Sequence, residues 1–577
     1  MRHHVPQLAT AATAATAATA ATVATVATAA IVATAGLVTA AAPTAMAART
    51  AAGDPVVTHR VIRSFDGVPI HTTLFLPPGA SRTSPAPLVM RSHGWGGHGE
   101  RSLDEASSTT RALLGAGYAV LTWDERGFGY SGGEVAILKP GLEGRDASAL
   151  IDWVATDPDV APAIACESGR RADGDCADPV IGMTGGSYGG GIQLLTAAFD
   201  AAFSSTTAGD EPRVDALAPE ITWHDLRYSL YDNRVLTFGW GEALYGLGAA
   251  TAHAEGLDPR NPAGPQAGGL AAQIHQSQAE GTATGQLSDP SVAYLGASSL
   301  AVYGRQHPVA VPSLFLQGSV DTLFDLTEAA RNFHHVRQHA PAKLVVFCGG
   351  HVSCPADYAD AGDRTFMNRA ILDWFARHLK GERVGTGPPV VYRTNEGVWR
   401  KARDFPPPGV TGLRASGGGQ VVGTPVPTTL GADPVNDGAG DAAASGLLTA
   451  QPNPAGDPHA FDVPVSAARG GALELVGIPT AHLAVSGTGS VAHLFLKLVD
   501  RESGEVVNLQ ETPVRVEELS ADPRTLDVTM SGIAYTLPAG HHLDLQVSTS
   551  SLLHDRARTA AQLDVAVRVE VPVRGTR

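Results

Sequence analysis

The stretch PVIGMTGGSYGGGIQLLTAAF, residues 179–199, decides how the first part of the chain folds. Residues 179–184 form a short apolar run of strand length, and residues 192–199 have a spacing that suits a helix. Between them, Gly-Gly-Ser-Tyr-Gly at 185–189 matches G-x-S-x-G, which marks a strained turn that raises a serine hydroxyl above a sheet edge. Glycines suit such a turn because a Cβ would clash there. The pattern predicts Ser187 as a nucleophile, and the alternative is a glycine-rich turn with an incidental serine.

Short apolar strands alternate with amphipathic helices on both sides of this turn. The expected strands span residues 61–65, 70–75, 88–90, 118–123, 214–219, 313–317 and 343–347. The expected helices span residues 109–114, 146–154, 327–336 and 364–379. This alternation is typical of an α/β fold with an open, mostly parallel sheet covered on both faces. Such sheets carry their chemistry at the carboxyl ends of the strands, so we expect the site in the loops that follow Met90, Trp123 and Thr184.

A serine nucleophile needs a base that accepts its proton and an acid that orients the base. In the chain order of α/β-hydrolases, the acid and then the histidine follow the serine. Asp321 and His351 each follow one of the predicted buried strands, so both can converge on Ser187. Asp325 is the alternative acid, but it is better placed to cap the next helix. The sequence therefore predicts Ser187, Asp321 and His351 as a catalytic triad.

Hydrolysis through a tetrahedral intermediate also needs hydrogen-bond donors for the developing oxyanion. One predicted donor is the backbone N–H of Tyr188, which follows the nucleophile. The second is expected from the His93-Gly94-Trp95 loop, and the backbone N–H of Trp95 is the candidate. His93 is expected to orient that loop rather than to catalyse. The pattern implies no metal and no cofactor.

The first 47 residues differ in composition from the rest of the chain. Arg2 and two histidines precede a long Ala/Thr/Val tract, and Ala45-Met46-Ala47 matches an A-x-A cleavage pattern. These are the parts of a secretory signal, so we expect export; an uncleaved anchor or a misassigned start codon is the alternative. No other run reaches the 18 or so apolar residues of a membrane span. The net charge of −16 argues against a nucleic-acid partner, and nothing indicates an oligomeric state.

The chain has four cysteines, and they fall into two close pairs. Cys166 and Cys176 enclose a polar loop, while Cys348 and Cys354 enclose His351. Two local disulfides are the simplest pairing in an oxidising compartment, and the second would restrain the base. The alternative, a metal site made of the cysteines and His351, matches no standard zinc spacing.

The strand–helix alternation stops after the strand 214–219 and again after residue 388. The first interruption is rich in aromatic residues and predicts a helical cap, whose aromatic residues either line a substrate pocket or fill the cap's own core. The pocket candidates are Trp223, Tyr228, Tyr231 and Trp240. The second interruption leads into short strands with turn signals, which are typical of a β-sandwich or jelly roll. The expected organisation is a signal peptide at 1–47, hydrolase parts at 55–222 and 309–385, a cap at 223–308, a linker and strand extension at 386–450, and a jelly roll at 451–577.

Several motifs together resemble the Xaa-Pro dipeptidyl-peptidase/cocaine-esterase (CocE/NonD) hydrolases. In the α/β part they are GGSYGG at 185–190, DERGFGYSGG at 124–133, GSVDTLF at 318–324, GGH at 349–351 and DWFARHLKG at 373–381. In the C-terminal part the segments 475–479, 494–500 and 538–547 are similar to that family's jelly roll. The resemblance implies an acyl-enzyme mechanism, a helical cap and a C-terminal sandwich. One departure stands out: cocaine-esterase-like members take an oxyanion donor from a tyrosine hydroxyl where this chain has His93-Gly94-Trp95.

Members of this family differ in what they cleave. The first prediction is an Xaa-Pro dipeptidyl-peptidase, which needs an anionic group to capture the substrate's free amine; the cap offers Asp225, Asp232 and Glu242 without distinguishing among them. The alternative is a carboxylic ester or acyl-amide hydrolase whose cap aromatic residues bind an apolar acyl group. A non-catalytic protein that binds carbohydrate or a surface through the jelly roll is the remaining alternative.

Overall fold

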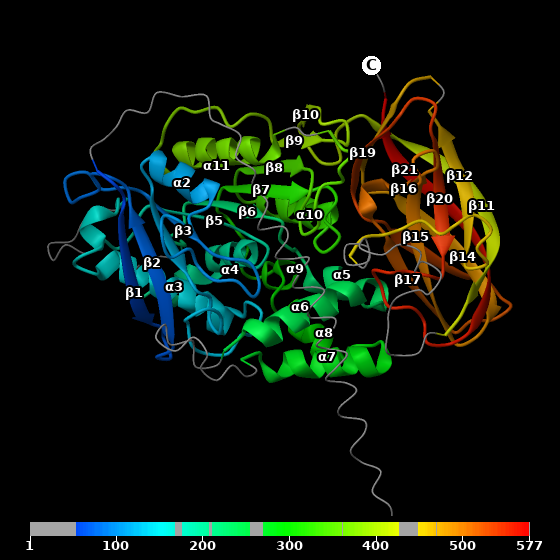
Figure 1. Cartoon of the computed structure of the whole chain (residues 1–577), viewed down its shortest axis with the longest axis horizontal. Coiled ribbons are helices and arrows are strands. Elements are labelled where there is room, and N and C mark those ends of the chain that lie inside the picture. Colours follow the sequence, from blue (N-terminus) through cyan, green and yellow to red (C-terminus); the bar gives the residue numbers. More distant parts are fainter. Residues whose placement is uncertain are drawn as a thin grey trace, which may run out of the picture.

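The computed structural model describes residues 53–167, 176–206, 211–253, 269–359, 362–425, 448–468 and 470–575. In these residues the chain forms an α/β unit, a helical cap and an all-β sandwich (Figure 1). The signal segment that the sequence predicts, residues 1–47, lies outside the described residues. Over the described ranges, no helix is both long enough and apolar enough to cross a membrane.

A ten-stranded sheet forms the centre of the α/β unit, in the order β1-β2-β4-β3-β5-β6-β7-β8-β9-β10. Its strands are β1 (Val56–Arg63), β2 (Pro69–Leu76), β3 (Leu88–Arg91), β4 (Ala119–Trp123), β5 (Ile181–Gly186), β6 (Ala216–Glu220), β7 (Ser313–Gly318), β8 (Ala342–Phe347), β9 (Val390–Arg393) and β10 (Trp399–Ala402). The pairs from β4 to β9 are parallel, whereas β1, β2 and β10 add antiparallel edges. The predicted α/β class with an open, mostly parallel sheet is confirmed.

Helices cover both faces of this sheet. The helices are α2 (Ser108–Gly115), α3 (Arg145–Thr156), α4 (Tyr188–Phe203), α10 (Leu326–Arg337) and α11 (Asp363–Leu379). Side chains of α2 and α11 share one buried cluster with the strands, and side chains of α3, α4 and α10 share another. Figure 1 shows α2 and α11 above the sheet and α4 below it. Because both faces are covered, the loops at the carboxyl ends of the strands remain as the place for a site.

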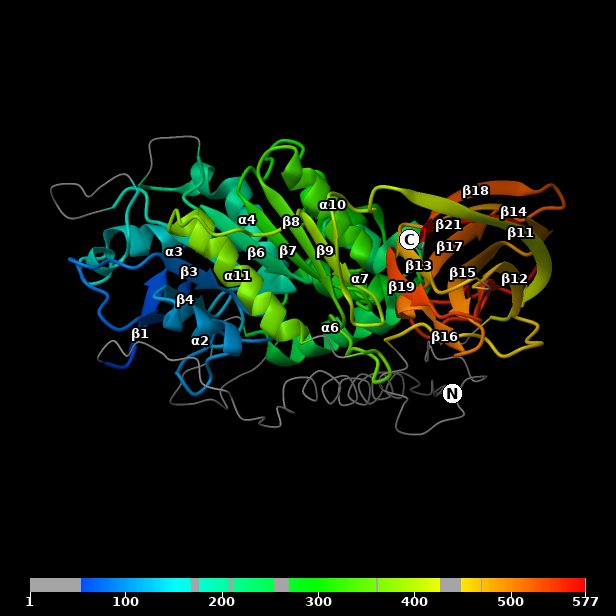
Figure 2. The same cartoon turned by 90° about the horizontal axis from the view of Figure 1, so that it is seen from above.

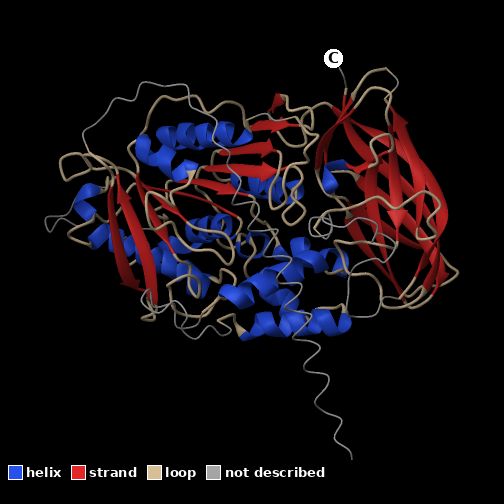
Figure 3. Ribbon diagram, in the orientation of Figure 1, coloured by secondary structure: helices blue, strands red, loops and turns tan. Residues whose placement is uncertain are grey.

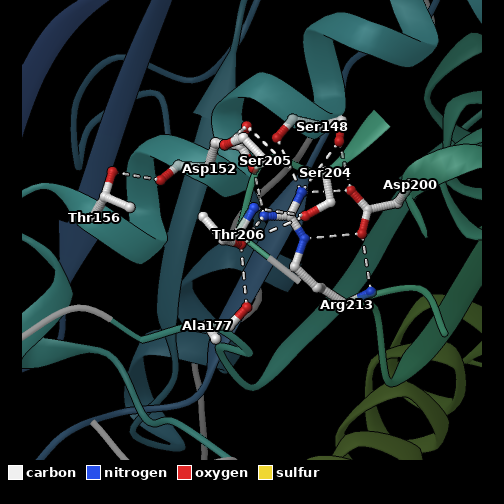
Figure 4. A network of polar contacts seen from close by, with 9 residues as sticks. All are labelled: Ser148, Asp152, Thr156, Ala177, Asp200, Ser204, Ser205, Thr206 and Arg213. Carbon is white, nitrogen blue, oxygen red and sulfur yellow. Dashed lines mark hydrogen bonds and ion pairs between the residues drawn. The ribbon is translucent and has the colours of Figure 1, made fainter. Parts of the chain in front are cut away.

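A buried ion-pair network holds α3 against the helix that follows Ser187 (Figure 4). The Arg213 guanidinium donates to Asp200 on α4 at 2.7 Å and to Asp152 on α3 at 2.6 Å. It also donates to the Ser148 hydroxyl at 3.1 Å. Since Arg213 and Asp200 are completely buried, removing one partner would leave an uncompensated charge at a cost of roughly 3–5 kcal/mol. The network therefore fixes the position of α4 on the sheet.

Between β6 and β7 the chain leaves the sheet and forms short helices in the segment for which the sequence predicts a cap. They are α5 (Leu226–Tyr231), α6 (Phe238–Thr251), α7 (Ala272–Thr284), α8 (Asp289–Gly296) and α9 (Leu300–Tyr303). Figure 3 shows them as a helical group on one side of the sheet, next to the sandwich.

The C-terminal sandwich consists of two antiparallel sheets, one with β18-β14-β21-β13-β19 and β11 beside β21, the other with β12-β20-β15-β16 and β17 beside β15. Its strands are β11 (Val410–Gly423), β12 (Ala460–Ala467), β13 (Leu473–Gly477), β14 (Thr480–Thr488), β15 (Val491–Asp500), β16 (Glu505–Val506), β17 (Thr512–Glu517), β18 (Arg524–Thr529), β19 (Ile533–Leu537), β20 (His542–Ser548) and β21 (Ala561–Arg574). The view from above places this sandwich at the end of the molecule, beyond β9 (Figure 2). The all-β C-terminal part is thus confirmed.

Strand β11 lies within residues 386–450, for which the sequence predicts a linker and a strand extension. It pairs with β21 along its whole length, so this part of the segment belongs to the sandwich. Glycines obscure the strand in the sequence, but they have a packing function. A Cβ on Gly417 would lie 2.9 Å from Val463, and one on Gly419 would lie 2.5 Å from Phe461. The glycines therefore allow β12 to approach β11 closely.

Candidate active site

Ser187 lies in the turn between β5 and α4 with φ 57° and ψ −119°, a strained conformation for a residue with a side chain. The glycines around it leave no room for a methyl group. A Cβ on either Gly185 or Gly189 would lie 2.5 Å from the carbonyl oxygen of Ser92. The backbone N–H of Ser187 donates to the Glu220 carbonyl at 2.9 Å, which ties the turn to β6. The turn thus has the geometry that the sequence motif predicts.

The structure brings the three predicted catalytic residues together. His351 Nε2 lies 2.8 Å from Ser187 Oγ, and His351 Nδ1 lies 2.8 Å from Asp321 Oδ2. Asp321 is completely buried, and its other carboxylate oxygen accepts backbone N–H groups of Leu323 and Phe324 at 3.0 Å. These hydrogen bonds fix the orientation of the carboxylate. The arrangement allows the serine hydroxyl to pass its proton to the imidazole.

The alternative acid, Asp325, has a structural function instead. Its carboxylate caps α10 by accepting the N–H groups of Thr327 and Glu328 at 2.9 and 3.2 Å. It also accepts the Tyr228 hydroxyl at 2.7 Å. Asp325 therefore connects the acid loop to the cap.

Glycines and a disulfide position the histidine loop. A Cβ on Gly350 would lie 2.5 Å from Asp321, and one on Gly318 would lie 1.8 Å from the carbonyl oxygen of Gly349. Cys348 and Cys354 form a disulfide across the loop, and Cys166 and Cys176 form the other. Both predicted disulfide pairs are present, which excludes the alternative that these cysteines ligate a metal.

Aromatic rings restrict the orientation of the His351 imidazole. Phe324 contacts it edge-on with centroids 5.1 Å apart, and Trp240 does so at 5.7 Å. The Trp240 indole N–H donates to the Thr322 hydroxyl at 3.1 Å. Trp240, a predicted pocket residue, thus packs on the histidine from the cap.

The sandwich supports the acid loop from behind. The Gln510 side chain donates to the Asp321 carbonyl at 2.8 Å, and the Thr322 hydroxyl donates to the Leu448 carbonyl at 2.5 Å. The cap contacts the sandwich as well, because the backbone N–H of Gly239 donates to the carbonyl of Leu553 at 3.1 Å. The C-terminal part therefore positions the acid and the cap.

The two predicted oxyanion donors belong to residues close to Ser187. Tyr188 is the first residue of α4, where backbone N–H groups have no partner within the helix. Gly94, which precedes Trp95, lies close to the nucleophile, since a Cβ on it would be 3.9 Å from Ser187 Cβ. The Trp95 indole N–H donates to the Leu244 carbonyl of α6 at 2.8 Å, so the backbone N–H of Trp95 is the group left for an oxyanion.

His93 holds the oxyanion loop in place, as the sequence predicts. Its Nε2 accepts the backbone N–H of Glu125 at 2.9 Å, and its Nδ1 lies 2.7 Å from the Gly94 carbonyl. This pair of contacts needs a neutral ring protonated at Nδ1. Burial lowers the pKa of His93 to about 4, which keeps the ring neutral near pH 7.

A cavity of about 150 Å³ opens beside Ser187 under the cap. Its wall combines residues of the oxyanion loop, the acid loop and the cap helices. The lining residues are Trp95, Ile137, Ser187, Tyr188, Trp223, Leu226, Leu230, Gly241, Leu244, Tyr245, Ile274, Ser277, Gln278, Leu287, Tyr294, Leu295, Leu323 and Phe324. Trp223 is the one predicted pocket residue among them. Sequence reasoning missed Leu323 and Phe324 as lining residues, although both belong to the predicted acid loop at 318–324.

Tyr228 and Tyr231 do not line this cavity, contrary to the prediction. Both border a separate, open cavity of about 780 Å³ on the other side of α5. The helical period explains the error, because Leu226 and Leu230, four residues apart, face the Ser187 cavity. The tyrosines lie on the opposite side of the same helix.

The cap carboxylates considered for an exopeptidase also lie outside the cavity. Asp225 pairs with Arg227 at 2.6 Å, and Asp232 borders the separate cavity. Glu242 accepts the Gln278 side-chain N–H at 2.7 Å from behind the cavity wall. Among the described residues that line the Ser187 cavity, none is acidic.

Comparison with known proteins supports this description. Residues 66–353 match the family model of the X-Pro dipeptidyl-peptidase (S15 family), and residues 382–558 match that of the X-Pro dipeptidyl-peptidase C-terminal non-catalytic domain. None of the curated proteins matches the chain.

Solved structures share the whole architecture at low identity. An aminopeptidase from a marine sediment Thaumarchaeota archaeon is 16% identical with a TM-score of 0.66, over 93% of this chain and 99% of the other. An α-amino acid ester hydrolase is 18% identical with a TM-score of 0.67, over 92% and 98%. A CocE/NonD family hydrolase from Staphylococcus aureus is 13% identical with a TM-score of 0.57, over 91% and 97%.

At these identities the solved structures establish the fold alone. The first family model covers most of the α/β unit with its cap, and the second covers the last strands of that unit and most of the sandwich. They favour a hydrolase over a non-catalytic binding protein. The chain therefore belongs to the X-Pro dipeptidyl-peptidase/CocE family and is a serine hydrolase that acts on peptide or small-molecule substrates.

Proposed function

We propose that this enzyme hydrolyses carboxylic esters or acyl amides whose acyl group is uncharged and mainly apolar. The observation that carries the proposal is the wall of the Ser187 cavity, which is built mainly of aromatic and aliphatic side chains, without a carboxylate among its described residues. A free α-ammonium group buried there would lose hydration without gaining an anionic partner, and that loss is costly. An uncharged acyl group gains from the same wall by the hydrophobic effect.

The geometry supports an acyl-enzyme mechanism. Ser187 Oγ attacks the carbonyl carbon while His351 Nε2 accepts its proton, and Asp321 holds the Nδ1–H and stabilises the imidazolium. The backbone N–H groups of Tyr188 and Trp95 stabilise the oxyanion. The imidazolium returns its proton to the leaving alcohol or amine as the acyl-enzyme forms. Water then attacks the ester of Ser187 with His351 as base, which releases the acid.

The second candidate is release of N-terminal Xaa-Pro dipeptides. It is supported by the family model over residues 66–353, which is that of the X-Pro dipeptidyl-peptidases. This activity would need a carboxylate to reach the substrate amine. Glu242 is a candidate, because it lies one hydrogen bond behind the wall residue Gln278.

A comparison of three chromogenic substrates separates the two candidates. They are a short-chain phenyl ester, an Ala-Pro anilide with a free amine, and the same anilide with an acetylated amine, with the Ser187→Ala variant as the blank. We expect turnover of the ester and no advantage from the free amine. Preference for the free-amine anilide, lost on acetylation, would overturn the ester and acyl-amide proposal in favour of the exopeptidase.

We also propose that the enzyme is exported. The N-terminal signal pattern and the two disulfides support an oxidising compartment. The test is to express the whole chain in a secreting bacterium and to sequence the N-terminus of the extracellular protein. We expect that terminus directly after Ala47, whereas full-length protein retained in the cells would contradict export.

A further inference from the structure

One hydrogen-bonding amide stands in the mainly apolar wall of the Ser187 cavity. Gln278, on α7, lines the cavity, and its side-chain nitrogen donates to Glu242 Oε1 at 2.7 Å and to Thr282 Oγ1 at 3.1 Å. Neither Glu242 nor Thr282 is a lining residue. Both N–H groups of the amide are therefore engaged behind the wall.

The carboxylate of Glu242 determines the orientation of the Gln278 amide. Burial raises the pKa of Glu242, and the hydrogen bonds from Gln278 and Thr282 oppose that shift. An ionised carboxylate accepts hydrogen bonds and has none to donate, so the nitrogen end of the Gln278 amide faces it in that state. The Thr282 hydroxyl, which also donates to Glu242 Oε1 at 3.3 Å, can then only accept from Gln278. The carbonyl oxygen is the part of the amide that remains for a ligand.

Two other polar groups of the wall have hydrogen-bond partners within the protein. The Ser277 hydroxyl donates to the Gln273 carbonyl at 2.8 Å, within α7. The Tyr245 hydroxyl lies 3.0 Å from His275 Nδ1. The Gln278 carbonyl oxygen thus offers an acceptor of fixed orientation to whatever enters beside Ser187.

We propose that Gln278 is a specificity-determining residue that accepts a hydrogen bond from a hydroxyl or amide N–H group on the acyl part of the substrate, with Glu242 as the positioning residue that orients it. The inference rests on the proposed function and sharpens it. The preferred acyl group is apolar over most of its length and carries one uncharged donor. A single neutral acceptor suits one such donor, whereas an ammonium group brings three.

The test uses 4-nitrophenyl esters of graded acyl chain length, each ending in a methyl, a hydroxyl or a methoxy group. The hydroxyl can donate to the Gln278 oxygen, whereas the methoxy oxygen can only face it with lone pairs. At the chain length that spans the cavity, we expect the wild-type enzyme to prefer the hydroxyl over the methoxy ester by about tenfold in kcat/KM. The difference should lie in KM, because the contact exists before and during the reaction.

Two variants identify the residues responsible. In Gln278→Leu the preference should disappear, so that the hydroxyl and methoxy esters have similar kcat/KM values. In Glu242→Gln the side chain at position 242 can donate as well as accept a hydrogen bond. Either orientation of the Gln278 amide is then satisfied, so the preference for the hydroxyl ester should fall to an intermediate value. Gln276→Leu is the matched control, because Gln276 lies exposed on the same helix and should keep the wild-type preference.

The outcomes separate the two proposals. Turnover of methyl esters with no discrimination between hydroxyl and methoxy at any length would overturn the role of Gln278 and leave the proposed function standing. Equal discrimination by the wild type and Gln278→Leu would do the same. Absence of turnover of every ester would overturn the proposed function and this inference with it.

Discussion

The loops at the carboxyl ends of β3, β5, β7 and β8 differ from the cap wall that faces them. At four glycines of these sheet-edge loops, backbone and side-chain atoms leave no space for a Cβ. An added Cβ would lie 2.5 Å from its neighbours at Gly185, Gly189 and Gly350 and 1.8 Å at Gly318. In the cap, Gly241 lines the cavity and a Cβ there would meet nothing within 4 Å. Close backbone packing thus positions the catalytic residues, whereas individual side chains contact the substrate.

This difference suggests how the two regions respond to change. A substitution in the sheet-edge loops moves the backbone and with it the distances among Ser187, His351 and Asp321. A substitution in the cap wall alters the shape or polarity of the cavity and leaves those distances in place. Chemistry and selectivity should therefore separate by region, and four measurements test that separation.

The largest effect is expected from Gly350→Ala. The new methyl group would overlap Asp321 in a backbone conformation, φ 134°, that a side chain rarely adopts. We expect kcat to fall about 10³-fold. This decrease lies between the one expected when a catalytic group is misplaced and the one expected when the acid is removed. Gly115→Ala, at an exposed position with free space, is the control. Rates should be normalised to the concentration of sites that react with a fluorophosphonate. An unchanged kcat would contradict the proposed difference between the sheet-edge loops and the cap wall.

The next effect concerns how the free energy of unfolding depends on pH because the folded protein keeps the His93 ring neutral. Burial lowers its pKa from 6.5 to about 4, so between these values the unfolded chain binds a proton that the folded chain does not. Stability should therefore fall as the pH drops from 6.5 to 4, by about 3 kcal/mol for this group. Denaturant unfolding of the wild type and His93→Gln at several pH values measures it. The variant should show a shallower slope over that window, and identical slopes would refute the assignment.

A third measurement compares the two disulfides. Removing Cys348–Cys354 or Cys166–Cys176 by paired alanine substitutions should each lower the unfolding free energy by about 2 kcal/mol. Only the first bridge encloses His351, so only its loss should lower kcat, by about tenfold. Activity should be assayed under conditions where both variants are folded. An equal loss of kcat in both would show that the bridge has no specific role in holding the base.

The smallest effect is expected in the cap wall. Leu230→Ala enlarges the Ser187 cavity and should shift the acyl preference toward longer chains by about tenfold in kcat/KM. Tyr231→Phe alters the same helix but borders the other cavity, so the chain-length preference should stay as in the wild type. A series of phenyl esters of increasing length measures both. A shift in Tyr231→Phe would show that the two cavities are coupled through α5.

Local sequence patterns were enough to find the parts of the site that depend on strand order. Ser187, Asp321 and His351 stand at strand ends in the expected order, and their contacts follow from parallel pairing. The two cysteine pairs could also be predicted from the sequence, because separations of 10 and 6 residues allow short local disulfide loops. Strand β11 could not be predicted in this way. Its glycines leave room for Phe461 and Val463 on the facing strand, but a glycine-rich run looks like a linker when that strand is unknown.

The sequence by itself determined the α/β order, the strained turn at Ser187 and the loops that carry the acid and the base, because each depends on neighbouring residues and on the pairing of consecutive strands. Only the tertiary structure decided which face of α5 meets the nucleophile, that Trp240 packs on His351, and that Gln278 stands before Glu242. These contacts join cap helices to loops far along the chain. They arise from how the cap docks on the sheet and the sandwich, and no local pattern records that docking.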